Sequence, residues 1–158
     1  MILTDLPDFL AALAPGRAIC GLDLGDKTIG VAVSDLRRTV STPIEVIRRS
    51  KFTEDAAKLL AILTDRNICG IILGLPLNMD GSSGPRVQST QAFARNLIKL
   101  TDLPITYWDE RLSTVAAERA LIEADTSRKR RREVIDQVAA GYILQGALDR
   151  LAYMAREI

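Results

Sequence analysis

The spacing of hydrophobic positions divides the first half of the chain into strands followed by a helix. Residues 18–34 read as two β-strands joined by a turn-forming Gly-Asp-Lys sequence, which predicts a hairpin. Another extended segment is expected near 43–47. Apolar residues then recur at helical spacing over 52–66. The short apolar run 68–73 shows no alternation, which is typical of a parallel strand buried on both faces.

The second half of the chain alternates loops, helices and one more strand. Residues 75–84 are rich in Gly, Pro, Asn and Asp and predict a loop, and Pro85 suits the first position of a helix. A strand is expected over 104–108, and a long final helix over 133–154. The predicted buried stripe of this last helix contains Val134, Val138, Tyr142 and Ala147.

These elements predict one α/β domain with a mixed central sheet flanked by helices. We expect the domain to span 1–158, with 1–16 as an N-terminal extension. Residues 124–132 carry five basic residues against one acid and no apolar residue after Ala124, so they are predicted to form a mobile basic loop. The basic residues of this loop are Arg128, Lys129, Arg130, Arg131 and Arg132.

Composition limits the chemistry and the compartment. The 21 Lys+Arg and 20 Asp+Glu give a net charge of +1, so any affinity for nucleic acid must be local. With no histidine, imidazole catalysis and histidine metal ligands are excluded. Cys20 and Cys69 lie in apolar runs without zinc-site spacing and are interpreted as buried thiols of a reducing compartment. No signal peptide or apolar run of about 20 residues is recognisable, which favours a cytoplasmic protein without a membrane segment.

Acidic residues stand at three places where strands end or the last helix begins. Asp23 interrupts an apolar strand, where a carboxylate is costly unless it is paired, hydrogen-bonded or bound to metal. Asp109 and Glu110 follow another strand, and Asp136 opens the last helix, where the helix dipole alone also favours an acid. Three converging carboxylates would suit Mg²⁺ or Mn²⁺, and two such ions about 4 Å apart would support phosphodiester hydrolysis.

Four ordered motifs closely resemble the YqgF family, also called RuvX, of Holliday-junction-resolvase-like proteins. They are GLDLGDKTIGVAVSD (21–35), GLPLNMDGS (74–82), DERLST (109–114) and IDQVAAGYILQ (135–145). The resemblance implies an RNase H-like fold and a nuclease that processes the 5′ end of pre-16S ribosomal RNA. It also maps the metal-binding and catalytic acids onto Asp23, Glu110 and Asp136, with Asp109 supporting Glu110 or replacing it.

Several polar residues are candidates for substrate contact. Asn78 and the backbone around Gly81 could meet a sugar–phosphate chain, although a purely structural turn is equally consistent with their residue types. Arg111 could contact phosphate or pair with a neighbouring acid. The basic residues of 124–132 could neutralise phosphates beside the cut, or form a solvated loop.

Three other functions remain open at this point. Phosphoryl transfer from ATP is disfavoured because 158 residues provide no second lobe to close a nucleotide cleft. A Holliday junction resolvase acting on branched DNA would share the same carboxylates, and a nucleic-acid-binding factor with weak catalysis would not need all three. The partner is expected to be precursor rRNA or else DNA, and the protein is expected to be a monomer or weak homodimer.

Overall fold

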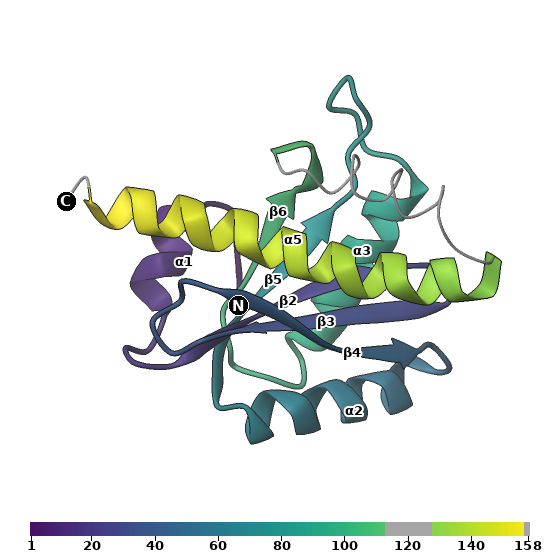
Figure 1. The fold of residues 1–158 in the computed structure, drawn as a ribbon, viewed down its shortest axis with the longest axis horizontal. Coiled ribbons are helices and arrows are strands. Elements are labelled where there is room, and N and C mark those ends of the chain that lie inside the picture. Colours follow the sequence, from purple (N-terminus) through teal and green to yellow (C-terminus); the bar gives the residue numbers. More distant parts are fainter. Residues whose placement is uncertain (113–127, 157–158) are drawn as a thin grey trace.

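A six-stranded mixed sheet forms the centre of the domain (Figure 1). The structure is a computed structural model that describes residues 1–112 and 128–156, with the backbone alone for 128–134, 136 and 156. Its strands are β1 (Ile2–Leu3), β2 (Ala18–Leu24), β3 (Thr28–Ser34), β4 (Ser41–Arg48), β5 (Ile68–Leu75) and β6 (Ile105–Asp109).

The strand order in this sheet is β1-β6-β5-β2-β3-β4. β2 and β3 form the predicted antiparallel hairpin, and β4 continues antiparallel beside β3. β5 runs parallel to β2, β6 runs parallel to β5, and β1 runs parallel to β6. The prediction of a mixed central sheet is therefore confirmed, and the carboxyl ends of β2, β5 and β6 lie at the same edge.

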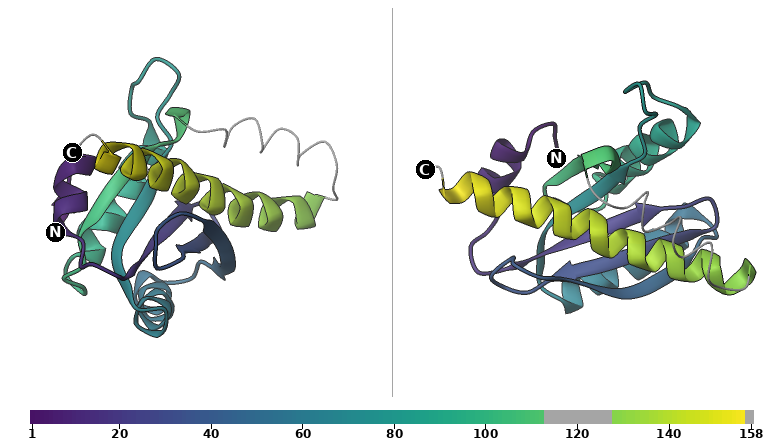
Figure 2. Two further views of the ribbon diagram at one scale, coloured as in Figure 1. Left: turned by 60° about the vertical axis from the view of Figure 1, so that its left-hand side comes forward. Right: turned by 45° about the horizontal axis from the view of Figure 1, so that its top comes forward.

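Helices cover both faces of the sheet (Figures 1 and 2). α2 (Phe52–Asp65) and α3 (Pro85–Leu97) pack on one face, where they share a hydrophobic core with the sheet. α1 (Leu6–Ala12) and α5 (Arg128–Arg156) cover the other face with a second core. Because both faces are covered, β2 and β3 are buried at every position. The predicted helices at 52–66 and from Pro85 onward are confirmed.

The predicted N-terminal extension, 1–16, is built into this domain. Ile2 pairs with Ile105 of β6, so the first strand adds to the edge of the sheet. α1 begins after Asp5, whose carboxylate accepts a hydrogen bond from the Asp8 amide at 2.8 Å. Its Phe9 is completely buried in the core beneath α5. The first residues therefore pack as part of the sheet and the core of this domain.

The long helix α5 corrects two predictions. It begins at Arg128, so residues 128–132 are helical and the predicted loop over 124–132 is wrong for that part, while 124–127 lie outside the described residues. Arg and Lys are good helix formers, so a basic run without apolar positions can still extend a helix. Tyr142 was predicted to be buried but is 36% exposed; the buried stripe contains Ala139, Ala140, Ile143, Leu144, Ala147, Leu148 and Leu151.

The structure also bears on the expectations about the two cysteines and about membrane segments. Cys20 and Cys69 are buried and not bridged, and burial raises the pKa of the Cys20 thiol to about 12. In the described parts of the chain, no helix combines the length and the apolarity needed to cross a membrane.

Candidate active site

Asp23 lies near the carboxyl end of β2 and is almost inaccessible to solvent. Its side chain is only 1% exposed, and its backbone pairs with Gly30 of β3. Successive side chains of a strand alternate between the two faces of the sheet. Since Leu22 and Leu24 belong to the core on the α2 and α3 face, Asp23 points to the face covered by α5.

Glu110 reaches the same face from the end of β6. Trp108, two residues earlier, packs in the core beneath α5, and Glu110 follows it as the first residue of the 3-10 turn η1 (Glu110–Leu112). The Glu110 side chain is 9% exposed. Two carboxylates from the ends of separate strands are therefore buried on the same face of the sheet. A site formed by Asp23 and Glu110 together requires this arrangement.

Gly74 provides the space that the Glu110 carboxylate occupies. This glycine lies in β5, the strand between β2 and β6, and pairs with Trp108. A Cβ atom at this position would lie 3.0 Å from Glu110 Oε1 and would collide with Ile143 Cδ1 of α5. The side chains of Glu110 and Ile143 thus close over the backbone of β5. Sequence reasoning did not single out Gly74, because nothing in a Gly-Leu-Pro sequence reports which side chains approach it.

Asp109 has a different environment from its neighbour Glu110. Its carboxylate receives hydrogen bonds from the Arg111 guanidinium, with Nη2 2.7 Å from Oδ2 and Nε 3.1 Å from both oxygens. The Arg111 amide donates a further bond to Oδ1 at 3.0 Å. These bonds, chiefly the one from the guanidinium, hold the pKa of Asp109 below its usual range. Asp109 therefore serves as the partner of Arg111.

The loop between β5 and α3 contains two of the predicted substrate contacts and projects from the body of the domain (Figure 1). Asn78 Nδ2 donates to Ser82 Oγ at 3.0 Å, and the Gly81 amide donates to the Asn78 carbonyl at 2.8 Å. Gly81 has φ +84°, a conformation that favours glycine. Met79 is 92% exposed. The structural-turn interpretation is supported, and the exposed parts of this loop are accessible to a ligand.

Arg111 connects the loop to the site. Besides pairing with Asp109, its Nη1 donates to the Met79 carbonyl at 3.4 Å, and a Cβ at Gly81 would lie 3.4 Å from the same nitrogen. The Asp80 carboxylate also contributes to the raised pKa of Arg111, after the larger effect of Asp109. Arg111 thus holds the loop against the end of β6.

The third predicted acid and the basic cluster cannot be compared with this geometry. The Asp136 side chain and those of Arg128, Lys129, Arg130, Arg131 and Arg132 lie outside the described residues. The backbone of α5 places Asp136 one helical turn before Ala140, whose carbonyl oxygen would lie 3.4 Å from a Cβ at Gly21 of β2. Among the side chains that are described, no three acids or cysteines form a group able to hold a metal ion.

Comparison with known proteins gives a consistent family assignment. The sequence model of RuvX, described as Holliday junction resolvase, matches residues 17–150. A protein of Ruegeria pomeroyi is 70% identical over 151 residues, covering 96% of this chain and 98% of its own. One from Paracoccus denitrificans is 69% identical over 156 residues, covering 99% of both chains. Both relatives carry the name "Putative pre-16S rRNA nuclease".

The fold resembles a solved resolvase. The structure of Thermus thermophilus RuvC in complex with a Holliday junction substrate superposes with a TM-score of 0.51, covering 85% of this chain and 96% of that one. The two sequences are only 12% identical, so this likeness concerns the fold alone. It confirms the expected RNase H-like architecture.

Proposed function

The chain belongs to the RuvX family, and on this premise we propose that it is a metal-dependent endonuclease that processes the 5′ end of pre-16S ribosomal RNA. The family and its fold make the protein a phosphodiester hydrolase with a nucleic acid substrate. The choice of precursor rRNA rests on the names of relatives that are about 70% identical over nearly the whole chain. Such a protein acts in ribosome biogenesis, in the cytoplasm.

One structural observation carries this proposal: Asp23 and Glu110 are buried on the same face of the sheet at the ends of separate strands. Carboxylates are rarely buried, so two of them on one face of the sheet mark this place as a candidate site for chemistry. The helix α5, which contains Asp136, passes over the same face. We therefore assign Asp23, Glu110 and Asp136 as the catalytic acids.

The donor chemistry fits a hard divalent cation. Mg²⁺ and Mn²⁺ prefer oxygen ligands, and the sequence has no histidine that would favour zinc or another softer metal. Gly74 leaves room for the Glu110 carboxylate beside the sheet. Asp23, Glu110 and Asp136 would hold Mg²⁺ or Mn²⁺, which would activate water and stabilise charge on the scissile phosphate.

The residues of the chain have separate tasks in this mechanism. The buried position of Asp23 and Glu110 keeps bulk water away from the carboxylates and fixes their orientation before substrate binds. The projecting loop carries Asn78 and the Gly81 backbone, and Arg111 lies against it. These groups would guide the nucleic acid strand toward the acids. The basic residues 128–132 at the start of α5 would neutralise neighbouring phosphates.

Resolution of Holliday junctions is the second candidate, because the matching family model is described by that activity. The carboxylates would be the same, and only the substrate would differ. Purified protein should therefore be incubated with precursor rRNA, single-stranded DNA and a four-way DNA junction, each with Mg²⁺, Mn²⁺ or EDTA. We expect metal-dependent cleavage of the precursor rRNA at its 5′ side. Cleavage of the junction alone would favour the second candidate, and no cleavage of any substrate would contradict both.

A further inference from the structure

A cavity of about 120 Å³ opens where β2 ends and the chain turns toward β3. One wall is the turn itself, with Gly25 and Asp26. The first part of α3 also lines it, with Arg86 and Ser89, and Arg49 lies beside the turn. A site for one water needs about 10–15 Å³ on this scale, so the space is large enough for several waters or a phosphate group. The sequence analysis identified Gly25 and Asp26 only as turn residues and did not single out Arg49, Arg86 or Ser89.

The lining of this cavity is suited to an anion. Arg49 and Arg86 supply two guanidinium groups from different elements, against the single carboxylate of Asp26. Arg49 Nη1 donates to the Gly25 carbonyl at 2.7 Å, which fixes its guanidinium at the wall. Guanidinium groups bind phosphate oxygens through short, charge-assisted hydrogen bonds. The N-terminus of α3, which no side chain caps, adds to the positive potential at the same place.

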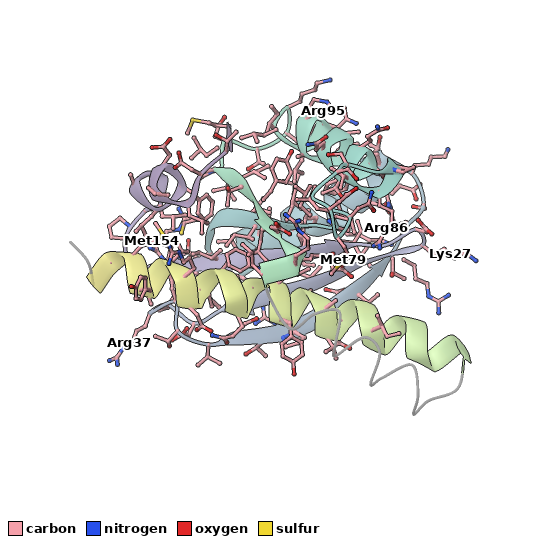
Figure 3. All side chains as sticks on the ribbon, turned by 90° about the horizontal axis from the view of Figure 1, so that it is seen from above. Lys27, Arg37, Met79, Arg86, Arg95 and Met154 are labelled. Atoms are coloured by element: carbon pink, nitrogen blue, oxygen red, sulfur yellow. The ribbon has the colours of Figure 1, made fainter. Side chains whose placement is uncertain are left out.

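The cavity lies at the same end of β2 as the candidate active site, but on the opposite face of the sheet. Leu24, which lines it, is the residue after Asp23, and the two side chains point to opposite faces of β2. Two residues of extended chain, from Asp23 to Gly25, span about 7 Å. Figure 3 shows Arg86 and Lys27 on the same side of the molecule, away from Arg37 and Met154. A nucleic acid strand that passes the catalytic acids and bends round this end of the sheet would therefore meet the cavity.

We propose that this cavity is a phosphate subsite, in which Arg49 and Arg86 hold a backbone phosphate that flanks the one being cut. The inference rests on the proposed function, because it assumes a nucleic acid strand at Asp23 and Glu110. The phosphate subsite sets the position of the nucleic acid strand along the catalytic site. Contacts of this kind fix register without reading bases.

Arg86 is the residue to change, because Arg49 also supports the β2–β3 turn through its bond to Gly25. Arg86 is exposed in the first turn of α3 and can be replaced without disturbing the core. Arg95 is a matched control, since it is an exposed arginine near the other end of the same helix. Figure 3 shows these two arginines well apart.

Binding of a short fluorescent single-stranded RNA should be measured by anisotropy in EDTA, at several salt concentrations, for the wild type, Arg86→Gln and Arg95→Gln. We expect Arg86→Gln to weaken binding about tenfold, the scale of one charge-assisted hydrogen bond. The slope of log K against log salt should shrink by about 0.7, the value for one phosphate of a single strand. Arg95→Gln should bind like the wild type.

Equal binding by Arg86→Gln and the wild type, or the same loss in Arg95→Gln, would overturn the proposal. A second readout locates the contact: in the wild type, the backbone amide signals of Gly25, Arg86 and Ser89 should shift when inorganic phosphate is added. Unchanged signals at high phosphate would also overturn it. Both measurements are made without metal and without cleavage, so a failure of the nuclease assay leaves their outcome interpretable.

Discussion

Arg111 and Asp109 form a close ion pair, with Arg111 Nη2 2.7 Å from Asp109 Oδ2. Glu110 lies between them in sequence, but its side chain is buried above Gly74 on the face covered by α5. The alternation of side chains at the end of β6 thus gives two adjacent acids different environments. One acid fixes the arginine that holds the projecting loop, and the other is directed to the candidate metal site.

This arrangement predicts different effects for the two acids. Glu110→Gln should abolish most cleavage and weaken Mn²⁺ binding, because an amide keeps the size of the carboxylate but not its charge. Asp109→Asn should cost less, about 10- to 100-fold in activity or metal affinity, as is typical for a residue that supports a ligand. Calorimetric titration with Mn²⁺ compares them directly. A greater loss of metal affinity in Asp109→Asn would exchange the two roles.

The Arg111–Asp109 pair predicts a pH dependence of stability. Arg111 holds the pKa of Asp109 below its usual value of about 3.9, so the pair stabilises the fold above that pH. This contribution is lost as the pH falls through the lower pKa of the folded state. Arg111→Gln should therefore lower the free energy of unfolding slightly near neutral pH, because ion pairs that are partly exposed contribute little.

Urea titrations of the wild type and Arg111→Gln test this pH dependence. The difference between the two proteins should shrink as the pH is lowered to about 3 and below, where Asp109 of the variant and of the unfolded chains becomes protonated. The same difference at neutral and acidic pH would show that Arg111 stabilises the fold by other means.

Gly74 predicts a loss of activity caused by a single methyl group. Gly74→Ala would push against Glu110 Oε1 and Ile143, so it should displace the carboxylate and suppress cleavage. Overpacking of this kind costs about 1–3 kcal/mol of stability. Gly70→Ala is the matched control, because it lies in the same strand and meets Phe9 and Leu13 far from the site. The control should be destabilised but keep its activity per folded molecule; equal activity of both variants would contradict the role of Gly74.

The basic residues at the start of α5 predict a salt-dependent contribution to binding. Replacing Arg128, Lys129, Arg130, Arg131 and Arg132 by Ser should weaken RNA binding and reduce the slope of log K against log salt by about 0.7 to 0.9 for each lost phosphate contact. Arg37→Ser serves as a control, since Figure 3 shows Arg37 at the end of the molecule opposite to the start of α5. An unaltered slope in the multiple variant would remove these residues from the binding surface.

From residue 18 onward, the sequence predicted the order of the described strands and helices well, because apolar runs and the period of 3.6 are strong local signals, but it did not predict β1 or α1. It predicted the buried side of α5 only in part, because Ala147 is buried as expected but Tyr142 is exposed. The spacing suggested Tyr142, whereas the helix buries Ala140 and Leu144 so that it can approach Gly21 closely. Small residues carry little hydrophobic signal, so a helix selected for close packing is not recognised from apolarity alone.

The candidate site was predictable to a similar extent. The sequence shows that Asp109 and Glu110 are adjacent after a strand, but which of them faces α5 depends on the register of β6, which pairs Trp108 with Gly74. The cavity lined by Arg86 is formed by the β2–β3 turn and the start of α3, which lie about 60 residues apart in the chain. Such proximity arises from tertiary packing and leaves no local pattern in the sequence.

The central claim is that Asp23 is a catalytic metal ligand, and cleavage of precursor rRNA by Asp23→Asn tests it most directly. The amide preserves the volume of this buried side chain but removes the negative charge that a divalent ion requires. Thermal unfolding and circular dichroism should confirm that the variant remains folded. We predict no Mg²⁺- or Mn²⁺-dependent cleavage by this folded variant, and cleavage at the wild-type rate, in a preparation free of contaminating nuclease, would contradict the account.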